Sequence, residues 1–311
     1  THFWKSNIMT HHGSDYYMSA KVISVRTNGT EMLNGQNLKG YYLPLGATNI
    51  MTTGHEYDDA FVVWDWTRVP GTTAVANQST ADLRWYLFGS NQFGGGVSNA
   101  HNGVMAYEHA YQGVEARKAY FFMGDAMVCM GSGIKAARTQ EVRTSVNQCL
   151  ANGEVTYGLS GHIYRLTNDL SDKNIDWAYH DNVGYIFPQN ESVTLRKAKQ
   201  TGAWRELEVT ASDKPVTKEI FSLWVSHGTT PQHEDYCYII MPDKPLSYFT
   251  DKKFENEIKI IVNSEQIQAI SNENKRQYAA VFYEPGEIRF AEDLVVAVNK
   301  KVIIYIEKKD K

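Results

Sequence analysis

The feature that most constrains the fold is a succession of short strand-like runs separated by glycine and proline turns. Runs rich in aromatic and β-branched residues recur along the whole chain of 311 residues, whereas long segments with apolar residues at helical spacing are scarce. The best candidate helices are short, at 77–86 and 263–270. Strands without alternating helices favour antiparallel sandwiches over a parallel sheet. The sequence therefore predicts an all-β fold.

The expected strands are spread evenly along the chain. Nineteen tyrosines and seven tryptophans suit a wide sandwich core, because their rings fill volume while their polar ends take hydrogen bonds. We expect strands at 16–25, in two pieces of 39–51 on either side of Pro44 and Gly46, and at 60–66, 118–134, 141–150, 184–188, 191–198, 219–228, 235–242, 257–262, 278–283, 293–298 and 301–309.

A change in composition marks a domain boundary. The stretch "MPDKPLSYFTDKKFENE" is charged, contains two prolines and is rich in turn-forming residues. After it the chain is rich in lysine, glutamate, isoleucine and valine, and it contains no tryptophan. We therefore predict a large β domain over 1–242 and a small β domain over 243–311.

Charge and hydropathy argue against several classes of protein. The formal net charge is −4, whereas generic nucleic-acid binding needs a basic surface. No apolar run approaches the ~18 residues of a membrane-spanning helix, so we expect no membrane partner. The opening "THFWKSNIMTHH" has neither the basic segment nor the apolar stretch of a signal peptide, and it reads like the middle of a protein.

The cysteines, histidines and glycines form no recognised cofactor motif. Cys129, Cys149 and Cys237 are widely spaced without a CxxC pair, so we interpret them as buried free thiols. The histidines lack HExxH spacing, which favours surface or hydrogen-bonded core positions over metal ligation. The stretch "GSNQFGGGVS" at 89–98 matches neither nucleotide-binding pattern and indicates a loop with close backbone approach. We predict no metal site.

Two polar stretches allow both a structural and a functional interpretation. In "TEMLNGQN", Glu31 and Asn34 either form a solvated turn, which spacing alone favours, or supply an acid–base group and an amide donor. In "VWDWTRVPGTT", Trp64 and Trp66 either form a sugar-binding platform or, as residue spacing favours, pack together in the core from one face of a strand.

Six stretches in a fixed order resemble the polysaccharide lyases of family 8, which include chondroitin AC and ABC, hyaluronate and xanthan lyases. They are "NGQNLKGYYLPLGAT", "GHEYDDAFVVWDWTRVPGTT", "FGGGVS", "KAYFFMGDAMVCMGSGI", "VRTSVNQ" and "WAYHDNVGYIFP". The resemblance covers nearly the whole chain and implies a large antiparallel β super-sandwich followed by a small C-terminal β-sandwich. In these lyases an N-terminal helical toroid carries the catalytic Asn, His, Tyr and Arg, and no segment here matches it.

The resemblance also gives the polar loop a role. Family members deliver a glutamate and an asparagine, three residues apart, from a loop of the β domain into the active-site cleft. Glu31 and Asn34 match these positions as catalytic residues, with Met32 and Leu33 where the family has a Ser-Gly pair.

For substrate binding, Trp85 matches a sugar-stacking tryptophan of the family. We also assign Asn37 to substrate binding.

The activity implied by the resemblance is β-elimination at a uronic acid of an acidic polysaccharide: chondroitin sulfate, dermatan sulfate or hyaluronan. A tyrosine of the toroid acts as base, and no organic cofactor is required. Some members bind divalent cations, but we find no ligand pattern for one. We expect a secreted or periplasmic protein of bacterial type whose isolated β part is inactive. The alternatives are a non-catalytic carbohydrate-binding sandwich and a purely structural module.

Overall fold

The computed structural model describes residues 1–78, 86–189 and 191–308. Every strand pairing in this part of the chain is antiparallel. The only α-helix among the described residues is α1 (Leu246–Thr250), and the other helical segments are single 3-10 turns. The expectation of an all-β fold is therefore confirmed.

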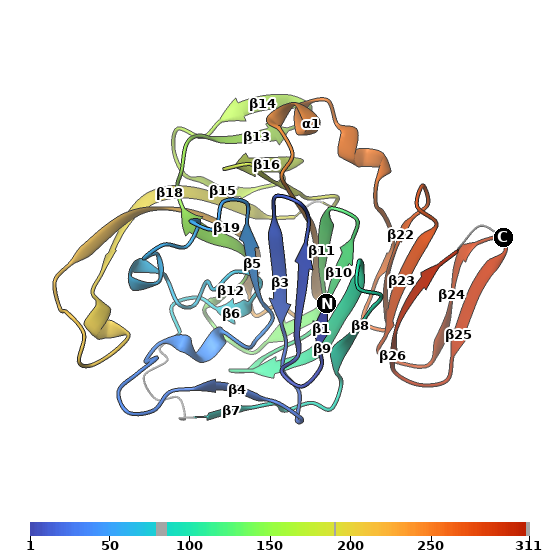
Figure 1. The fold of residues 1–311 in the computed structure, drawn as a ribbon, viewed down its shortest axis with the longest axis horizontal. Helices are drawn as coiled ribbons and strands as arrows, with labels where there is room; N and C mark the ends of the chain where they lie inside the picture. The colour runs from blue at the N-terminus through green and yellow to red at the C-terminus, as the bar shows by residue number, and fades with distance from the viewer. Residues whose placement is uncertain (79–85, 190, 309–311) are drawn as a thin grey trace.

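Three sheets build the larger part of the molecule (Figure 1). The first has the order β1 (His2–Phe3), β2 (Ile8–His12), β3 (Tyr17–Lys21), β5 (Ala47–Met51). The second has the order β14 (His162–Arg165), β13 (Val155–Leu159), β16 (Trp177–His180), β17 (Val183–Ile186), β20 (Glu234–Pro242), β11 (Ala126–Ala136), β10 (Val114–Met123), β9 (Gly103–Tyr111), β8 (Gly94–Ser98). The third has the order β15 (Leu170–Lys173), β18 (Val193–Gly202), β19 (Val216–Thr229), β12 (Glu141–Leu150), β6 (Thr73–Val75).

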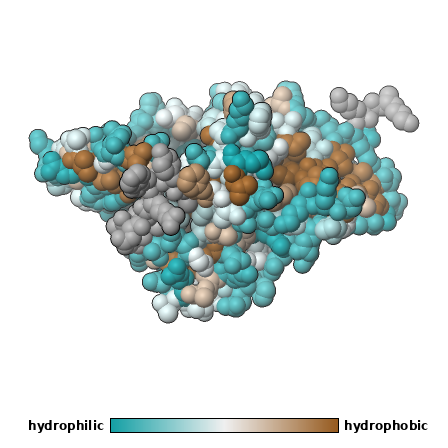
Figure 2. Space-filling view, turned by 90° about the horizontal axis from the view of Figure 1, so that it is seen from below, coloured by the Kyte–Doolittle hydropathy of each residue, from teal (hydrophilic) through white to brown (hydrophobic). Residues whose placement is uncertain are grey.

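The C-terminal strands form a smaller sandwich. One sheet has the order β21 (Lys259–Asn263), β22 (Ile267–Asn272), β23 (Gln277–Phe282), β26 (Val302–Glu307), and it faces the hairpin β24 (Gly286–Ala291), β25 (Leu294–Val298). The hairpin leaves a groove of about 570 Å³ beside Val298, Val302 and Ile304. Figure 2 shows this face of the C-terminal part carrying an apolar patch among hydrophilic surface.

The central strands of the nine-stranded sheet are buried on both faces, which explains their long apolar runs. Side chains alternate across a strand, so Tyr120 faces the core shared with the other two large sheets, whereas Phe121 faces the C-terminal sandwich. On that second side Phe121 belongs to the same apolar cluster as Ile270 and Val281. Full burial of one such ring stabilises a protein by about 1.5–3 kcal/mol. The two parts thus share a continuous interior.

Several expected elements were wrong. The run 60–66 is not a strand. It contains the 3-10 turn η2 (Phe61–Val63), in which Val63 N–H donates to Ala60 O at 3.0 Å. A turn lets Val62, Val63 and Trp64 all be buried together, which an alternating strand with one exposed face does not allow.

Two further differences have the same origin in tertiary packing. The first piece of 39–51 forms the 3-10 turn η1 (Gly40–Tyr42) instead of a strand, whereas the second piece is β5. Half of the candidate helix 263–270 belongs to β22, because β21 and β23 pair with this strand on both sides. Residues 79–85 of the other candidate helix lie outside the described residues.

The remaining elements connect the sheets. The 3-10 turn η3 (Trp204–Glu206) follows β18, and η4 (Lys253–Asn256) follows α1 in the segment that leads to the C-terminal sandwich. The three cysteines are free and buried, as expected. No helix in the described ranges is long and apolar enough to cross a membrane. The predicted boundary between 242 and 243 stays a prediction.

Candidate active-site loop

The polar loop emerges from a short two-stranded ribbon. Strand β4 (Asn28–Glu31) pairs with β7 (Tyr86–Phe88), and Glu31 lies opposite Tyr86 at the end of β4. Both Glu31 and Asn34 are exposed. In the part of the chain that the structure describes, neither the Glu31 carboxylate nor the Asn34 amide has a hydrogen-bond or ion-pair partner. The two groups are therefore free to contact another molecule or another part of the polypeptide.

A tight turn fixes Asn34 at the tip of the loop. Gln36 N–H donates to Leu33 O at 2.9 Å, and Asn34 and Gly35 have φ of 55° and 75°. Positive φ at both central residues defines a type I′ turn, for which Asn-Gly is the preferred pair. Met32, just before the turn, packs partly against the main core. The turn and this anchor hold the exposed residues at a set position on the surface.

Asn37 lies in the same loop but faces inward. Its Nδ2 donates to Thr30 Oγ1 at 2.9 Å and to Glu31 O at 3.0 Å. Its side chain also lies against Gly40, where an added Cβ would be 1.9 Å from Asn37 Oδ1. Asn37 thus closes the base of the loop. Its assignment to substrate binding stays a prediction, and Trp85, assigned to sugar stacking, lies outside the described residues.

In the tryptophan motif at 63–73, the structure favours the interpretation as core packing. Trp64 is buried in the main core, and Trp66 packs partly against it with its Nε1 donating to Phe61 O at 3.1 Å. Asp65 binds Arg68 at 2.7 Å, and the Arg68 guanidinium stacks 4.5 Å from the ring of Trp224. The two tryptophans are thus in or against the core, as expected, although from a turn and not from one face of a strand.

Buried tyrosines and histidines are poor candidates for a general base. Burial raises the pKa of each such phenol well above 10, so the phenol does not ionise, and burial lowers the pKa of each such imidazole, which makes it a weaker base. The tyrosines are Tyr107, Tyr120, Tyr185 and Tyr236, and the histidines are His109, His180 and His227. In the described ranges no group of three or more His, Cys, Asp or Glu side chains is placed to hold a metal ion.

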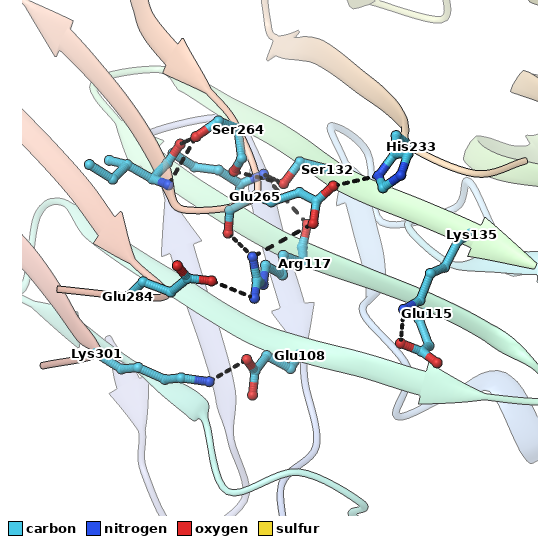
Figure 3. Close-up of polar contacts among 12 residues, drawn as sticks. Glu108, Glu115, Arg117, Ser132, Lys135, His233, Ser264, Glu265, Glu284 and Lys301 are labelled. Atoms are coloured by element: carbon cyan, nitrogen blue, oxygen red, sulfur yellow. Dashed lines mark hydrogen bonds and ion pairs between the residues drawn. The ribbon is translucent and has the colours of Figure 1, made fainter. Parts of the chain in front are cut away.

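A second polar region is the groove between the nine-stranded sheet and the C-terminal sandwich, of about 410 Å³ (Figure 3). Here Arg117 binds Glu284 at 3.1 Å, and His233 Nδ1 lies 2.9 Å from Glu265 Oε1. The other pairs are Lys135–Glu115 at 2.9 Å and Lys301–Glu108 at 2.5 Å. Each Arg, Lys and His side chain labelled in Figure 3 faces a carboxylate. Because these side chains already pair with one another, we interpret the groove as a junction between the large β part and the C-terminal sandwich. The β4 loop is the better candidate site.

Comparison with known families identifies both β parts of the chain. Residues 1–253 match the model of the polysaccharide lyase family 8 super-sandwich domain, and residues 259–311 match that of the family's C-terminal beta-sandwich domain. The chain belongs to polysaccharide lyase family 8.

Individual family 8 relatives agree with this assignment. A chondroitinase-AC of Pedobacter heparinus is 33% identical over 296 residues, which are 93% of this chain and 42% of the relative. A hyaluronate lyase of Staphylococcus aureus is 26% identical over 97% of this chain and 38% of the relative. A solved chondroitinase AC lyase, studied in oligosaccharide complexes, superposes with a TM-score of 0.92 at 30% identity, over 98% of this chain and 46% of that structure. The chain thus spans less than half the length of these relatives.

One part of this region gave no signal in the sequence. The connection between β18 and β19 contacts the β4 loop through two backbone hydrogen bonds: Leu38 N–H donates to Leu207 O at 3.0 Å, and Val209 N–H donates to Gly35 O at 2.9 Å. The two segments are more than 160 residues apart in the sequence. No local pattern predicts such a contact, because it exists only after the sheets have assembled.

Proposed function

We propose that this chain is the β portion of a glycosaminoglycan lyase that cleaves 1,4 bonds to uronic acid in chondroitin sulfate or hyaluronan by β-elimination. Glu31 and Asn34 would complete a composite active site whose other catalytic groups come from a helical toroid of the same polypeptide. The observation that carries the proposal is the pair of exposed side chains, without partners among the described residues, on a turn with fixed geometry. Family membership and the names of the relatives support it.

The chemistry assigns a task to each group. The base removes the C5 proton of the uronic acid, a C4–C5 double bond forms, the bond from C4 to the leaving oxygen breaks, and that oxygen takes up a proton. Negative charge develops on the uronate carboxyl, and hydrogen-bond donors aimed at it lower the barrier. The Asn34 amide can donate to a substrate oxygen or to the catalytic network. The Glu31 carboxylate can orient a phenol or guanidinium supplied by the toroid.

We further propose a secreted or periplasmic location. Chondroitin and hyaluronan are long polyanions that do not pass through a membrane, so their depolymerisation takes place outside the cytoplasm. The substrate itself is the partner that we assign to the surface around Glu31 and Asn34.

The test is the ultraviolet absorbance of the unsaturated uronate product, measured with chondroitin sulfate and hyaluronan. We expect this chain alone to be silent and the complete polypeptide to be active. In the complete polypeptide, Glu31→Gln and Asn34→Asp keep the shape of each side chain and should each lower kcat at least tenfold. Gln36→Ala, an exposed position in the same loop, is the matched control and should leave kcat unchanged.

The outcomes separate the alternatives. Turnover by this chain alone would show that the base lies among its own residues and would refute the composite site. Normal kcat in Glu31→Gln and Asn34→Asp would indicate a scaffold without catalytic groups. Retention of this chain on a chondroitin or hyaluronan matrix, together with normal kcat in both variants, would favour the carbohydrate-binding alternative.

A further inference from the structure

We propose that the connection between β18 and β19, residues 203–215, is a positioning element for the Glu31–Asn34 loop. In this assignment Glu206 acts through Lys39, and Val209 acts through Gly35. The inference rests on the proposed function for its catalytic consequence, whereas the docking of the two loops can be tested without any activity.

The connection lies at the end of a long arm formed by the paired strands β18 and β19. Strands β18 and β19 pair continuously from Val193↔Val225 to Gly202↔Val216, so the connection begins where a ten-residue ladder ends. Figure 1 shows this arm, in yellow, extending past the five-stranded sheet and turning back towards the blue loop that follows β4. The ladder links the connection to the core through ten paired residues on each strand. The connection can therefore fix the position of a loop that has no sheet partner of its own.

Backbone hydrogen bonds join the two segments within the turn and after it. Val209 N–H donates to Gly35 O at 2.9 Å, within the turn itself. Leu38 N–H donates to Leu207 O at 3.0 Å, three residues further along the loop. The first bond lies one residue from Asn34. A displacement of the connection would therefore be transmitted directly to the amide that we assign to the substrate.

Close packing around Gly35 adds steric specificity. An added Cβ on Gly35 would be 2.4 Å from Val209 Cγ2, and the φ of +75° already disfavours other residues. Val209 is itself 52% exposed, so it lies outside the core and its packing partner is the turn. The sequence of each segment thus fits the other: a glycine where the backbone must come close, and a branched side chain above it.

A charged pair completes the contact. Lys39 Nζ binds the Glu206 carboxylate, and the hydrogen bond from Lys39 lowers the pKa of Glu206. The same carboxylate accepts a hydrogen bond from Ala203 N–H at 3.2 Å, within the η3 turn. Because both side chains are partly exposed, the pair contributes orientation more than stability. Glu206 is therefore held by its own turn while it holds the C-terminal end of the β4 loop.

The catalytic consequence follows from the sensitivity of reaction rates to geometry. Misplacing a catalytic group by about 1 Å can cost about a hundredfold in rate. Glu206 and Val209 are not expected to touch substrate; they act on the loop that does. Their loss should lower kcat and leave KM nearly unchanged.

The test compares Glu206→Ala with Glu208→Ala. Glu208 lies in the same connection, but its carboxylate is bonded to Thr210 and not to the β4 loop. In this chain we expect the amides of Leu38 and Val209 to exchange hydrogen at least tenfold faster in Glu206→Ala and at the wild-type rate in Glu208→Ala. In the complete polypeptide we expect kcat to fall about tenfold in Glu206→Ala with KM within twofold. Glu206→Gln, whose single amide oxygen can keep one of these two hydrogen bonds, should recover part of kcat.

The two readouts separate the possible failures. Unchanged exchange in Glu206→Ala would overturn the docking. Faster exchange with normal kcat would show that docking has no catalytic role. A complete wild-type polypeptide without lyase activity would refute the proposed function and the positioning role together, and the exchange rates would still decide whether the two loops dock.

Discussion

Lys118 should give this protein an unusual dependence of stability on pH. It lies in β10 and is fully buried, and its Nζ donates to Gly71 O at 2.6 Å. The rings of Tyr120 and Tyr236 lie 6.0 and 5.9 Å from the ammonium. Burial lowers the pKa of Lys118 to about 7 in the folded protein, because the charged form loses its hydration.

The sign and size of the effect follow from proton linkage. Lysine has its ordinary pKa near 10.4 when unfolded, so between pH 7 and pH 10 the unfolded chain binds a proton that the folded chain has released. Stability therefore rises with pH in this window. Between pH 7 and pH 9, with 1.36 kcal/mol for each unit of pKa difference, Lys118 alone should add about 2 kcal/mol to the free energy of unfolding. Stability is lost as pH falls towards 7.

The assay is urea unfolding at pH 7 and pH 9 of the wild type and of Lys118→Met. Methionine fills similar volume without titrating, and Gly71 O keeps a hydrogen bond from Tyr120 Oη at 3.3 Å. We expect the pH-dependent gain of the variant to be smaller than that of the wild type by about 2 kcal/mol. Lys135→Met, on the exposed surface of the neighbouring strand, is the control and should keep the wild-type gain.

Equal gains in the wild type and in Lys118→Met would refute the reasoning. Such a result would mean that Lys118 keeps its proton in the folded state over the whole window. Other groups titrate in both proteins and cancel in the difference, so only the Lys118 contribution remains.

Three further predictions test other parts of the fold. Burial raises the pKa of Glu191 to about 7, so the free energy of unfolding falls as pH rises from 5 to 7. In Glu191→Gln this fall, measured by urea unfolding, should be smaller by about 2 kcal/mol. Gly184→Ala should destabilise by about 1–3 kcal/mol, because the new methyl would lie 1.9 Å from the Phe249 ring; a wild-type thermal midpoint would contradict this. A thiol reagent should label no cysteine in the native protein and all three in urea: Cys129, Cys149 and Cys237.

Some of the strands could be read from the sequence. The stretch 141–150 was expected to be a strand and is β12. Its β-branched residues and the turn residues around it are local signals, and pairing with β19 agrees with them. The two-residue turn Asp181–Asn182 between β16 and β17 is also local in origin, since both residues adopt positive φ readily. Where local preference and tertiary pairing agree, the prediction holds.

The failures occurred where packing overruled local preference. The run 60–66 has the composition of a strand, yet it buries three consecutive side chains as a turn against the core. Half of the candidate helix 263–270 lies in β22, where two neighbouring strands satisfy the backbone hydrogen bonds. The first outcome depends on contacts with β18 and β19, which are distant in sequence, whereas β22 pairs with the strands directly before and after it.

The candidate site divides in the same way. The sequence by itself determined that residues 30–37 form a polar turn, because Asn34-Gly35 prefers the type I′ conformation that the structure shows. Only the tertiary structure decided that the loop is held by a connection whose Glu206 is 167 residues from Lys39. The physical reason is the distance along the sequence between the residues that interact. Turn conformation depends on the dihedral preferences of two residues, whereas the position of a loop depends on contacts that form only when distant strands are already paired.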